Sequence, residues 1–593
     1  MKFERARKAV VLAAGFGTRL RPFTASTPKP LLPVWGEPML SRVVDLLRSW
    51  GVEEIAVNCH HLHGQVEAWC EKNGCRAVHE PKILGTGGVL NQLRDWIGGD
   101  DFYLANGDIV VENAPEEGLG GETAPASGAQ TLGWCLVSED GPRTIEAEPE
   151  HGFVTCWHSP DPGWPGTFTY CGIARLRAKV LDYVVPQGFS SIVDAYEKAA
   201  MDGWLMRSVR CDGMLWTDAG TVETYMELNR DGKEHAYARI PQVSAALAAL
   251  GGGVDGGTNG SVEFVGARGS DRAFFKTDGA YIIVYDDAKR GENARYASHA
   301  RFLAAHGIRV PKVLADLPQA KTLVLEDAGG DDLLSRSRVR GEDRLYDYVA
   351  AVEELARFNA LLAAAKAEGV ALEPKFDAAL YKWERDLFAE HCLGTRFRRG
   401  LPADVEKELE QAAARLLEEP PALVHRDFQS TNIVWNTKDF KIIDFQGMRE
   451  GAAAYDLASL LYDPYIELRD GERRALAALY AKKSGHSGIA DVLPLAAVQR
   501  LVQALGAYGR LASVGKKEFS RHVLPALQNL LTAADEAGFD ATGALAEDLI
   551  AEEQKNLRQA GGEHGHDHGH DCGCGEHGCE GHGHHHCDCG GEK

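Results

Sequence analysis

Long apolar runs, positive charge and closely spaced cysteines are all scarce in the body of this 593-residue chain. No apolar run reaches the roughly 18–20 residues that a membrane-spanning helix needs, so we expect no membrane contact. The formal net charge of −22 disfavours a nucleic-acid-binding surface. Eight of the 13 cysteines stand singly along the chain, which fits a reducing, cytoplasmic location better than a disulfide scaffold.

The composition that is present is that of folded, globular protein. Hydrophobic residues make up 44% of the chain and charged residues 25%, close to the usual proportions for soluble domains. A chain of this length exceeds what one hydrophobic core can support, so we expect two or more domains. The apolar stretch near the N-terminus is too short for a targeting segment and is interpreted as a first strand.

The pattern along the chain divides it into four parts. Over residues 8–230, runs such as KAVVLAA and DFYLANGD alternate with amphipathic segments, which predicts a mixed α/β sheet covered by helices on both faces. Short strands followed by long helical stretches occupy the region from about 260 to 555. We therefore predict domains at 1–232 and 261–558, a glycine-rich linker at 233–260 and a disordered tail at 559–593.

A glycine-rich turn directly follows the first strand, in the string Leu12-Ala-Ala-Gly-Phe-Gly-Thr-Arg-Leu20. Glycines there let the backbone approach phosphate groups closely, with N–H groups directed at their oxygens. Arg19 and Lys29 are the cations that would balance phosphate charge during group transfer. A glycine turn after a first strand is common, so by itself it is weak evidence for a phosphate-binding site. The longer string around it is more specific.

That longer string, LAAGFGTRLRPFTASTPKPLLPV, resembles the signature of the sugar-phosphate nucleotidyltransferase family. The resemblance covers nearly all of residues 8–230 and implies a Rossmann-like domain. It also implies catalytic roles for Arg19 and Lys29. The nucleotide-binding residues that it implies in this loop are Ala13, Gly15, Gly17, Thr18 and Arg19.

Two aspartates complete the first candidate site. Asp108, in FYLANGDIV, ends a strand, where open α/β sheets place their ligands. Asp218 stands in LWTDAGTVETY, which matches the family's W-x-D-x-G-T stretch. The resemblance implies that both carboxylates hold Mg²⁺, and oxygen ligands with few protein carboxylates suit that ion. A lone strand-end aspartate can also be purely structural.

Two further segments resemble parts of the same family. EPKILGTGG is similar to its base-recognition loop, which implies nucleotide contacts at Gly85, Thr86 and Gly87. TYCGI is similar to the strand that lines the sugar site; the implied sugar-phosphate contacts are Lys29, Asn106 and Gly172. The implied reaction is in-line attack of a sugar-1-phosphate oxygen on the α-phosphorus of an NTP. His60 and His61 are interpreted as packing or surface residues rather than ligands.

A second constellation lies in the C-terminal half, in HRDFQSTN and KIIDFQG. This H-x-D-x₄-N string followed by D-F supplies Asp427 to orient and deprotonate a hydroxyl, with Asn432 and Asp444 for the Mg²⁺ that accompanies ATP. It resembles the catalytic apparatus of aminoglycoside phosphotransferases, choline kinases and protein kinases, which implies a bilobal kinase-like fold. The string IIDFQGMREGAAAYDLASLLYDPY is similar to anomeric sugar kinases of the N-acetylmuramate/N-acetylglucosamine type. Asp456 is predicted to support the catalytic loop.

The strands that precede this loop depart from the protein-kinase pattern. Val284 and Tyr285 occupy the region in which V-A-I-K would place its lysine. The candidate substitutes that could reach an ATP phosphate are Ser270, Arg272 and Lys276.

The segment from Gly561 to Lys593 mixes histidine and cysteine at short spacing, with five cysteines among its last 22 residues. Imidazoles and thiolates bind Zn²⁺, Ni²⁺ or Cu⁺. The C-x-C pairs differ from zinc-ribbon C-x₂-C spacing, so no defined finger is implied. A dispensable disordered tail remains the alternative.

The two resemblances combine into one functional hypothesis. They point to an N-acetylmuramate 1-kinase and an N-acetylmuramate-1-phosphate uridylyltransferase on one chain, using ATP, UTP and Mg²⁺ in cell-wall sugar recycling. Expected partners are the sugar, its 1-phosphate and the nucleotides. The alternative with the same folds is a choline kinase fused to a phosphocholine cytidylyltransferase. A third hypothesis, a metal-storing protein with degenerate enzyme domains, is disfavoured by the intact motif residues.

Overall fold

The computed structural model describes residues 5–112, 114–116, 118–120, 130–211, 214–230, 236–251, 262–268, 272–288, 291–436, 439–513 and 515–562. Its contacts form two compact units. Unit 1 comprises Met1–Phe376, Glu419–Leu461 and Arg469–Ile489, and unit 2 comprises Asp377–Glu418, Tyr462–Leu468 and Ala490–Lys593. Both candidate phosphate-transfer sites lie in unit 1. The domain boundaries predicted from the sequence stay a prediction.

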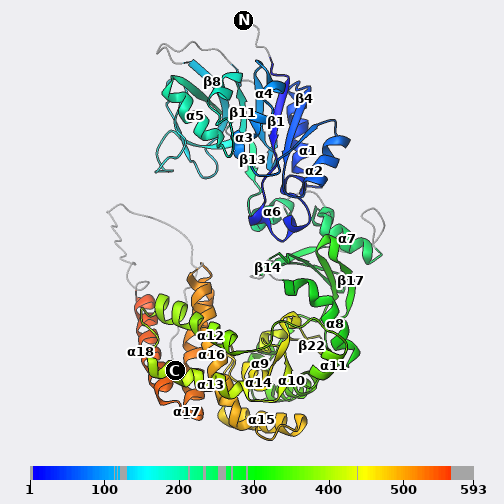
Figure 1. Cartoon of the computed structure of the whole chain (residues 1–593), viewed down its shortest axis with the longest axis vertical. Coiled ribbons are helices and arrows are strands. Elements are labelled where there is room, and N and C mark those ends of the chain that lie inside the picture. Colours follow the sequence, from blue (N-terminus) through cyan, green and yellow to red (C-terminus); the bar gives the residue numbers. More distant parts are fainter. Residues whose placement is uncertain are drawn as a thin grey trace, which may run out of the picture. The chain divides into compact units, whose positions relative to one another are not determined.

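A nine-stranded sheet organises the N-terminal part of unit 1 (Figure 1). Its main path runs β10-β9-β11-β6-β1-β4-β5, and β8 joins β12 to β11. The central strands β6, β1, β4 and β5 are parallel, whereas β11 is antiparallel to β6. The strands are β1 Lys8–Leu12, β4 Glu54–Cys59, β5 Arg76–His79, β6 Phe102–Asn106, β8 Gln130–Ser138, β9 Ile145–Ala147, β10 Val154–Cys156, β11 Thr167–Leu176 and β12 Trp204–Arg210.

Helices cover both faces of this sheet, as the alternating pattern predicted. In β1, Ala9 and Val11 belong to one apolar cluster, whereas Val10 between them belongs to a second cluster on the opposite face. Side chains of α1 Met39–Ser49 and α2 His63–Lys72 complete the first cluster. The second cluster contains α3 Gly85–Gln92, α4 Arg94–Ile97 and α5 Ile192–Met201. The mixed sheet flanked by helices is therefore confirmed.

Short elements at the ends of these strands carry the site residues. The antiparallel pair β7 and β13 is the one that matters most for the site. The elements are η1 Thr18–Leu20, η2 Phe23–Ala25, η3 Lys29–Leu31, β2 Pro33–Val34, β3 Glu37–Pro38, β7 Ile109–Glu112, η4 Ala178–Asp182, β13 Leu215–Asp218 and α6 Val222–Arg230.

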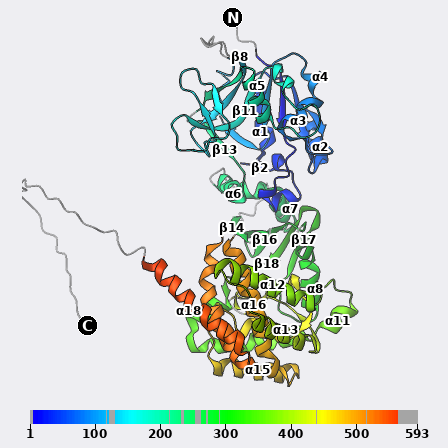
Figure 2. The same cartoon turned by 60° about the vertical axis from the view of Figure 1, so that its left-hand side comes forward.

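A five-stranded antiparallel sheet, in the order β14-β15-β16-β18-β17, begins the kinase-like part (Figure 2). It comprises β14 Glu263–Arg268, β15 Arg272–Thr277, β16 Ala280–Tyr285, β17 Val313–Leu317 and β18 Thr322–Glu326. Accompanying elements are η6 Gly291–Arg295, α8 Tyr296–Ala305 and η7 Pro318–Ala320.

The second lobe within unit 1 holds the catalytic loop between small sheets and helices. Its helices are α9 Leu333–Arg340, η8 Gly341–Asp343, α10 Arg344–Asn359, α11 Leu362–Ala367, η10 Ser430–Asn432, η11 Phe445–Gly447, α14 Ala454–Leu461 and α15 Asp470–Ser484. Its strands are β19 Asp331–Asp332, β20 Pro421–Val424, β21 Ile433–Trp435, β22 Phe440–Ile442 and β23 Arg449–Ala452.

A third apolar cluster joins the two sheets of unit 1. It contains Leu20 and Phe23 beside the glycine turn, together with Phe275 and Val284 from the kinase-like sheet. The Phe23 and Phe275 rings meet at 6.1 Å between centroids. Residues 233–260, predicted as a linker, contain η5 Ala236–Arg239 and α7 Pro241–Ala249. Ile240, Val243 and Ala246 are fully buried in this same cluster, so part of that stretch is packed structure.

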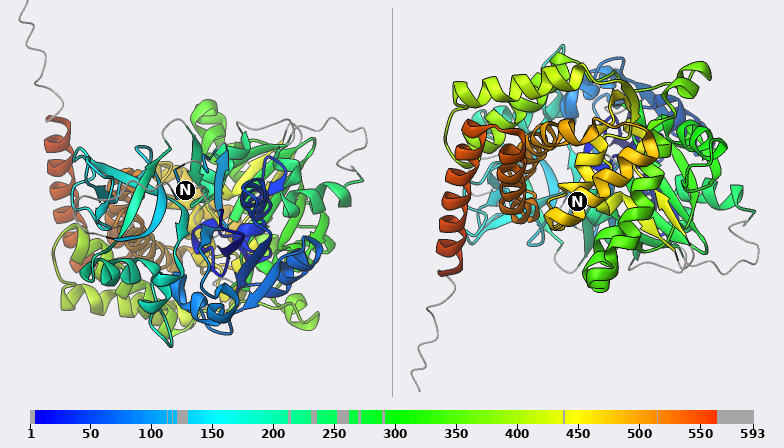
Figure 3. Two further views of the ribbon diagram at one scale, coloured as in Figure 1. Left: turned by 90° about the horizontal axis from the view of Figure 1, so that it is seen from above. Right: turned by 90° about the horizontal axis from the view of Figure 1, so that it is seen from below.

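Unit 2 is helical among the residues described. Its elements are α12 Ala378–Leu387, the π-helix η9 Phe388–Arg396, α13 Ala403–Leu417, α16 Ile489–Ser513, η12 Lys517–His522, α17 Val523–Ala537 and α18 Asp540–Gly562. The last two pack side by side (Figure 3). Among the described residues α16 alone is long and apolar enough to cross a membrane, and 67% of its most apolar window is buried inside the protein. The predicted disordered tail begins within α18, and residues 563–593 lie outside the described part.

Candidate active sites

The glycine turn after β1 borders a cavity of about 190 Å³. Its lining includes every nucleotide-loop residue predicted from the sequence: Ala13, Gly15, Gly17, Thr18 and Arg19. Gly17 has φ +61°, and a Cβ there would lie 2.8 Å from Thr24 Cγ2, so glycine is required for both backbone conformation and space. At Gly15 a Cβ would meet nothing within 4 Å. The open side of the turn thus gives a ligand access to the backbone.

Lys29 brings the two predicted metal aspartates together. β13 pairs with β7, with Asp218 opposite Ile109, so Asp108 and Asp218 become neighbours despite their separation in sequence. Lys29 Nζ lies 2.8 Å from Asp108 Oδ2 and 3.0 Å from Asp218 Oδ1. Arg19 Nη2 lies 3.7 Å from Asp218 Oδ2. Two cations and two carboxylates therefore converge at the mouth of the glycine turn.

This donor set fits Mg²⁺. Asp108 and Asp218 present carboxylate oxygens on either side of one ammonium group, and Mg²⁺ is held by one or two carboxylates with substrate phosphates supplying further oxygens. The sulfur and imidazole ligands that softer metals prefer do not line the described cavity.

A buried hydrogen-bond chain fastens the glycine turn to the predicted base-recognition segment, and the sequence did not indicate this chain. Ala13 N donates to Asn58 Oδ1 at 2.6 Å, and Asn58 Nδ2 donates to Glu80 Oε1 at 2.7 Å. The other oxygen of Glu80 accepts from Leu84 N at 2.8 Å. Glu80 is fully buried, so its carboxylate depends on these donors. The feature of the sequence that could have indicated this chain is the acidic residue Glu80 between a strand and a glycine loop.

The predicted base-recognition residues begin α3, and part of their bonding capacity is already used. Gly87 N donates to Ser190 O at 2.8 Å, and Thr86 Oγ1 accepts from Ile192 N at 2.9 Å. Gly85 has φ +78° and no room for a Cβ, which would lie 2.6 Å from Ser190 O. These contacts brace the loop against residues 190–192. A role for Gly85, Thr86 and Gly87 in nucleotide binding stays a prediction.

Asn106 and Gly172, predicted to contact the sugar phosphate, are adjacent on the paired strands β6 and β11. Gly172 has φ +78°, and a Cβ there would stand 2.8 Å from Asn106 Nδ2. The histidines interpreted as non-ligands indeed bond to backbone: His60 Nδ1 to Glu80 O at 2.7 Å and His61 Nε2 to Thr24 O at 2.9 Å.

A cavity of about 400 Å³ lies between the five-stranded sheet and the catalytic loop. The sheet contributes Arg272, Phe274 and Ile283, and the loop side contributes Asn432 and Asp444. Its apolar walls suit a planar base, and its polar end holds the predicted metal ligands.

The alternation of side chains along β15 and β16 decides which of them face this cavity. Arg272, Phe274, Tyr281 and Ile283 line it, whereas the intervening side chains, including Val284, face the third apolar cluster. Val284 therefore points away from the cavity, which explains why no lysine occurs there.

Of the three predicted substitutes, Arg272 reaches the predicted metal ligand Asp444. Its Nη2 lies 2.9 Å from Asp444 Oδ1, whereas Lys276 Nζ pairs with Asp327 Oδ2 at 3.0 Å. Ser270 lies outside the described residues.

The catalytic loop is organised by the buried carboxylate of Asp456. It accepts from His425 N at 2.7 Å and from Arg426 N at 2.8 Å, directly before Asp427. Arg426 has φ +82°, a conformation that non-glycine residues adopt only where surrounding contacts impose it. Asn432 Nδ2 donates to Asp427 O at 2.8 Å, which ties the predicted metal ligand to the predicted base. The supporting role predicted for Asp456 is confirmed.

Asp444 is held ionised by its neighbours. Burial opposes ionisation, but the Arg272 guanidinium and a hydrogen bond from Gln446 outweigh it, so the pKa of Asp444 is lowered. Asp444 has φ +66°. His425 Nε2 donates to Ile443 O at 3.0 Å, and burial lowers the pKa of His425, so its ring is neutral.

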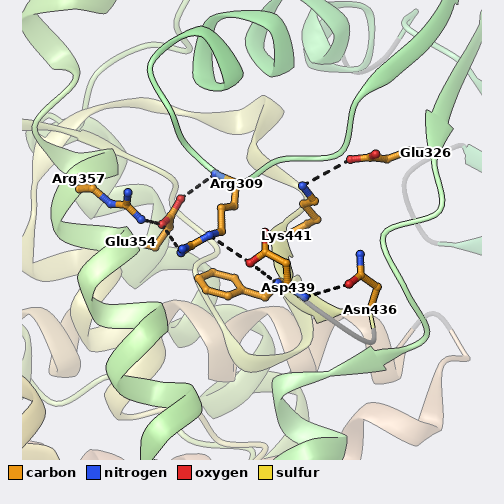
Figure 4. Close-up of polar contacts among 8 residues, drawn as sticks. Arg309, Glu326, Glu354, Arg357, Asn436, Asp439 and Lys441 are labelled. Carbon is orange, nitrogen blue, oxygen red and sulfur yellow. Dashed lines mark hydrogen bonds and ion pairs between the residues drawn. The ribbon is translucent and has the colours of Figure 1, made fainter.

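A charged cluster supports the strand that leads to Asp444 (Figure 4). Glu354, fully buried on α10, accepts from Arg309 N at 2.7 Å and Arg309 Nη1 at 2.9 Å, and it also pairs with Arg357. Arg309 Nε pairs with Asp439 at 3.2 Å, and Arg309 O accepts from Ile442 N at 2.7 Å. The cluster therefore anchors both ends of β22, and no sequence motif indicated it.

Comparison with known proteins also divides the chain into an N-terminal nucleotidyltransferase part and a C-terminal kinase part. Residues 9–114 match the MobA-like NTP transferase domain, and residues 261–495 match the phosphotransferase enzyme family. The N-acetylmuramate alpha-1-phosphate uridylyltransferase of Neisseria meningitidis serogroup B is 36% identical over 36% of this chain and 94% of its own length. The N-acetylmuramate/N-acetylglucosamine kinase of Pseudomonas aeruginosa is 26% identical over 41% of this chain and 74% of its own.

Other relatives share only part of their length with this chain. The bifunctional protein GlmU of Methanococcus maripaludis is 29% identical over 36% of this chain, which spans about half, 51%, of that relative. On the strength of the glycine turn, the paired aspartates and these matches, the chain belongs to the MobA-like NTP transferases and carries, on the same polypeptide, a kinase domain of the phosphotransferase enzyme family.

Proposed function

We propose that this chain is a bifunctional enzyme that phosphorylates the anomeric hydroxyl of an amino sugar and then converts the sugar 1-phosphate to a UDP-sugar. The observation that carries the proposal is the presence of both sites on one chain, each similar to a relative named for N-acetylmuramate. The product of the first reaction is the substrate of the second. We place this sequence of reactions in cell-wall sugar recycling.

In the kinase step, Asp427 would accept the proton of the anomeric hydroxyl as its oxygen bonds to the γ-phosphorus of ATP and the bond to ADP breaks. Asn432 and Asp444 would hold Mg²⁺, which supplies positive charge to the phosphate oxygens. The Arg272 guanidinium, 2.9 Å from Asp444, would bind a phosphate oxygen beside them. The aromatic and aliphatic walls of the cavity would hold adenine.

In the nucleotidyl transfer, a phosphate oxygen of the sugar 1-phosphate attacks the α-phosphorus of UTP and pyrophosphate leaves. No protein nucleophile is needed, because positioning and charge stabilisation suffice. The glycine turn would bind phosphates through its backbone, and Lys29 and Arg19 would neutralise the charge that develops. Asp108 and Asp218 would hold Mg²⁺, while Asn106 and Gly172 would face the sugar phosphate.

UTP is proposed over GTP or CTP because the Neisseria meningitidis relative, which is 36% identical and covered over 94% of its length, is named a uridylyltransferase. The named kinase relative likewise favours an amino sugar over choline. The alternative, a choline kinase joined to a cytidylyltransferase, is an outcome of the test. A cytoplasmic location is part of the proposal, and it is supported by the eight cysteines in the described residues, none of which forms a disulfide.

The test is mass spectrometry of products from the full chain with Mg²⁺, ATP, UTP and N-acetylmuramic acid, beside a reaction with ATP, CTP and choline. UDP-N-acetylmuramic acid should form only when both ATP and UTP are present. Asp427→Asn should leave the free sugar, and Asp218→Asn should stop at the 1-phosphate. CDP-choline would transfer the assignment to the alternative, and no product in either reaction would refute both substrate assignments.

A further inference from the structure

Three potential metal ligands meet on the nucleotidyltransferase domain outside both sites. His63 and Glu67 lie one turn apart on α2, and His79 ends β5. The potential ligand atoms all lie within 4.8 Å of one another, and His63 Nδ1 is 3.2 Å from Glu67 Oε1. The His63 and His79 rings stack at 4.0 Å between centroids with an interplanar angle of 16°.

The fold explains why these residues converge. β4 and β5 are parallel neighbours joined by α2, with Cys59 opposite His79 in the register. The carboxyl ends of the two strands therefore lie at the same edge of the sheet, and α2 begins at that edge. His63 at the start of the helix and His79 at the end of the strand are thus brought together by the βαβ connection. Both imidazoles are exposed, so an ion can reach them from solvent.

The donor chemistry selects the class of ion. Two imidazoles and a carboxylate suit Zn²⁺, Ni²⁺, Co²⁺ or Cu²⁺, whereas Mg²⁺ prefers oxygen ligands alone. The cluster contains no cysteine: Cys59 on β4 and Cys70 on α2 are buried in the first apolar cluster.

We propose that His63, Glu67 and His79 form a divalent transition-metal site on the nucleotidyltransferase domain. Binding needs Zn–N and Zn–O bonds of roughly 2.0–2.2 Å, so the ligand atoms must close in on the ion, and one imidazole must rotate out of the stack so that both ring lone pairs point at it. Side chains at an exposed edge have room for this rotation. The remaining coordination positions face solvent and take water.

Hydrogen bonds connect this site to the proposed nucleotide-binding loops. His79 immediately precedes Glu80, whose buried carboxylate accepts from Asn58 Nδ2 and Leu84 N, and Asn58 in turn accepts from Ala13 N. Fixing His79 therefore fixes the backbone that holds both the glycine turn and the base-recognition loop. Metal binding should change the KM for UTP rather than the rate of the kinase reaction.

The test uses the full chain, whose tail also offers nine histidines and five cysteines after residue 562, so the readout must be specific to each site. Histidine modification by diethyl pyrocarbonate, followed by peptide mass spectrometry, meets this need. It is measured in EDTA and then with Zn²⁺ added beyond the amount that protects the tail. Labelling of His63 and His79 should fall by about tenfold or more when Zn²⁺ is bound. Exposed His158 on the same domain is the internal control and should label equally in both conditions.

Two variants separate binding from folding. Glu67→Gln keeps the shape of the side chain but removes the anionic ligand, so the Zn²⁺ concentration that protects both histidines should rise by about 10- to 100-fold. His79→Ala should abolish protection of His63, while an unchanged thermal unfolding profile in EDTA shows that the domain is intact. Protection confined to tail peptides, or protection of His63 that survives in His79→Ala, would overturn the proposal. Because the readout is labelling, it does not depend on the proposed enzymatic activities.

Discussion

Lys29 Nζ and Asp108 Oδ2 lie 2.8 Å apart, and the same ammonium group is 3.0 Å from Asp218. Lys29 is buried, and its ammonium group lies between the two carboxylates. Binding of Mg²⁺ and a nucleotide would give these carboxylates a new cation and release Lys29 toward a phosphate. We therefore propose that these ion pairs hold Lys29 in place until the nucleotide binds.

Lys29→Met should therefore lower kcat/KM of the nucleotidyl transfer by about 10²–10³-fold, because it removes a charge that stabilises the transferring phosphate. The kinase reaction of the same chain should be unchanged. The measurement is pyrophosphate release with sugar 1-phosphate and UTP. Lys179→Met, which breaks an exposed pair with Asp182, is the matched control and should retain full activity. Equal losses in the two variants would contradict the role given to Lys29.

Arg272→Met should raise the KM for ATP by about 10- to 100-fold, because Arg272 is the predicted substitute that reaches Asp444. Arg272→Lys should recover part of this loss, since it restores charge without the planar fork of donors. Lys276→Met is the control: its ammonium pairs with Asp327 instead, so the KM should change less than about twofold. ADP release measured against ATP concentration distinguishes the three variants. A larger effect at Lys276 would reverse the assignment.

The two active sites differ in how far the sequence could predict them. The glycine turn, Asp108 and Asp218 each end or follow a strand in a recognisable string, so their convergence follows from the sheet. For the kinase site the sequence offered Arg272 and Lys276 as candidate cations but could not choose between them, whereas strand alternation places Arg272 in the cavity and Lys276 pairs with Asp327. Glu80 and Glu354 hold loops in place by accepting hydrogen bonds from backbone N–H groups. A motif of side chains does not indicate such contacts.

The packed part of the predicted linker shows a related limit. Ile240, Val243 and Ala246 recur at helical spacing around Pro241, which stands at the first helical position, and this pattern favours a helix. The glycines that follow this pattern led to the prediction of a flexible linker instead. The spacing could not show which surface this helix packs against, because that surface is built from residues near the glycine turn and from the kinase-like sheet, which are far apart in the sequence.

The kinase reaction should lose activity as the pH falls from about 8 to about 6. Burial raises the pKa of Asp456 to about 7, and only the ionised carboxylate can accept from both His425 N and Arg426 N. Protonation would release part of the catalytic loop. His425 does not confound the profile, because burial lowers its pKa and it stays neutral.

The sign of the accompanying stability change separates this effect from acid unfolding. The folded pKa of Asp456 lies above its ordinary value of about 4, so its contribution to stability is full below about pH 4 and is lost as the pH rises through about 7. Acidification in this window thus strengthens folding through Asp456 while activity falls. Parallel pH–rate and thermal unfolding profiles check this, and Asp456→Asn should remove the acid limb near pH 7. If the loss of activity at low pH persists in this variant, another titrating group causes it.

Gly172→Ala should impair the nucleotidyl transfer more than Gly188→Ala, although the two substitutions impose similar backbone strain. Gly172 has φ +78° and Gly188 has φ +87°, so each loses about 1 kcal/mol or more in the left-handed region. A Cβ at 172 would lie 2.8 Å from Asn106 Nδ2, whereas at 188 it would meet nothing within 4 Å. Only the first displaces the side chain predicted to contact the sugar phosphate. The KM for sugar 1-phosphate should therefore rise about tenfold in Gly172→Ala alone, and equal kinetics in the two variants would remove Asn106 from the site.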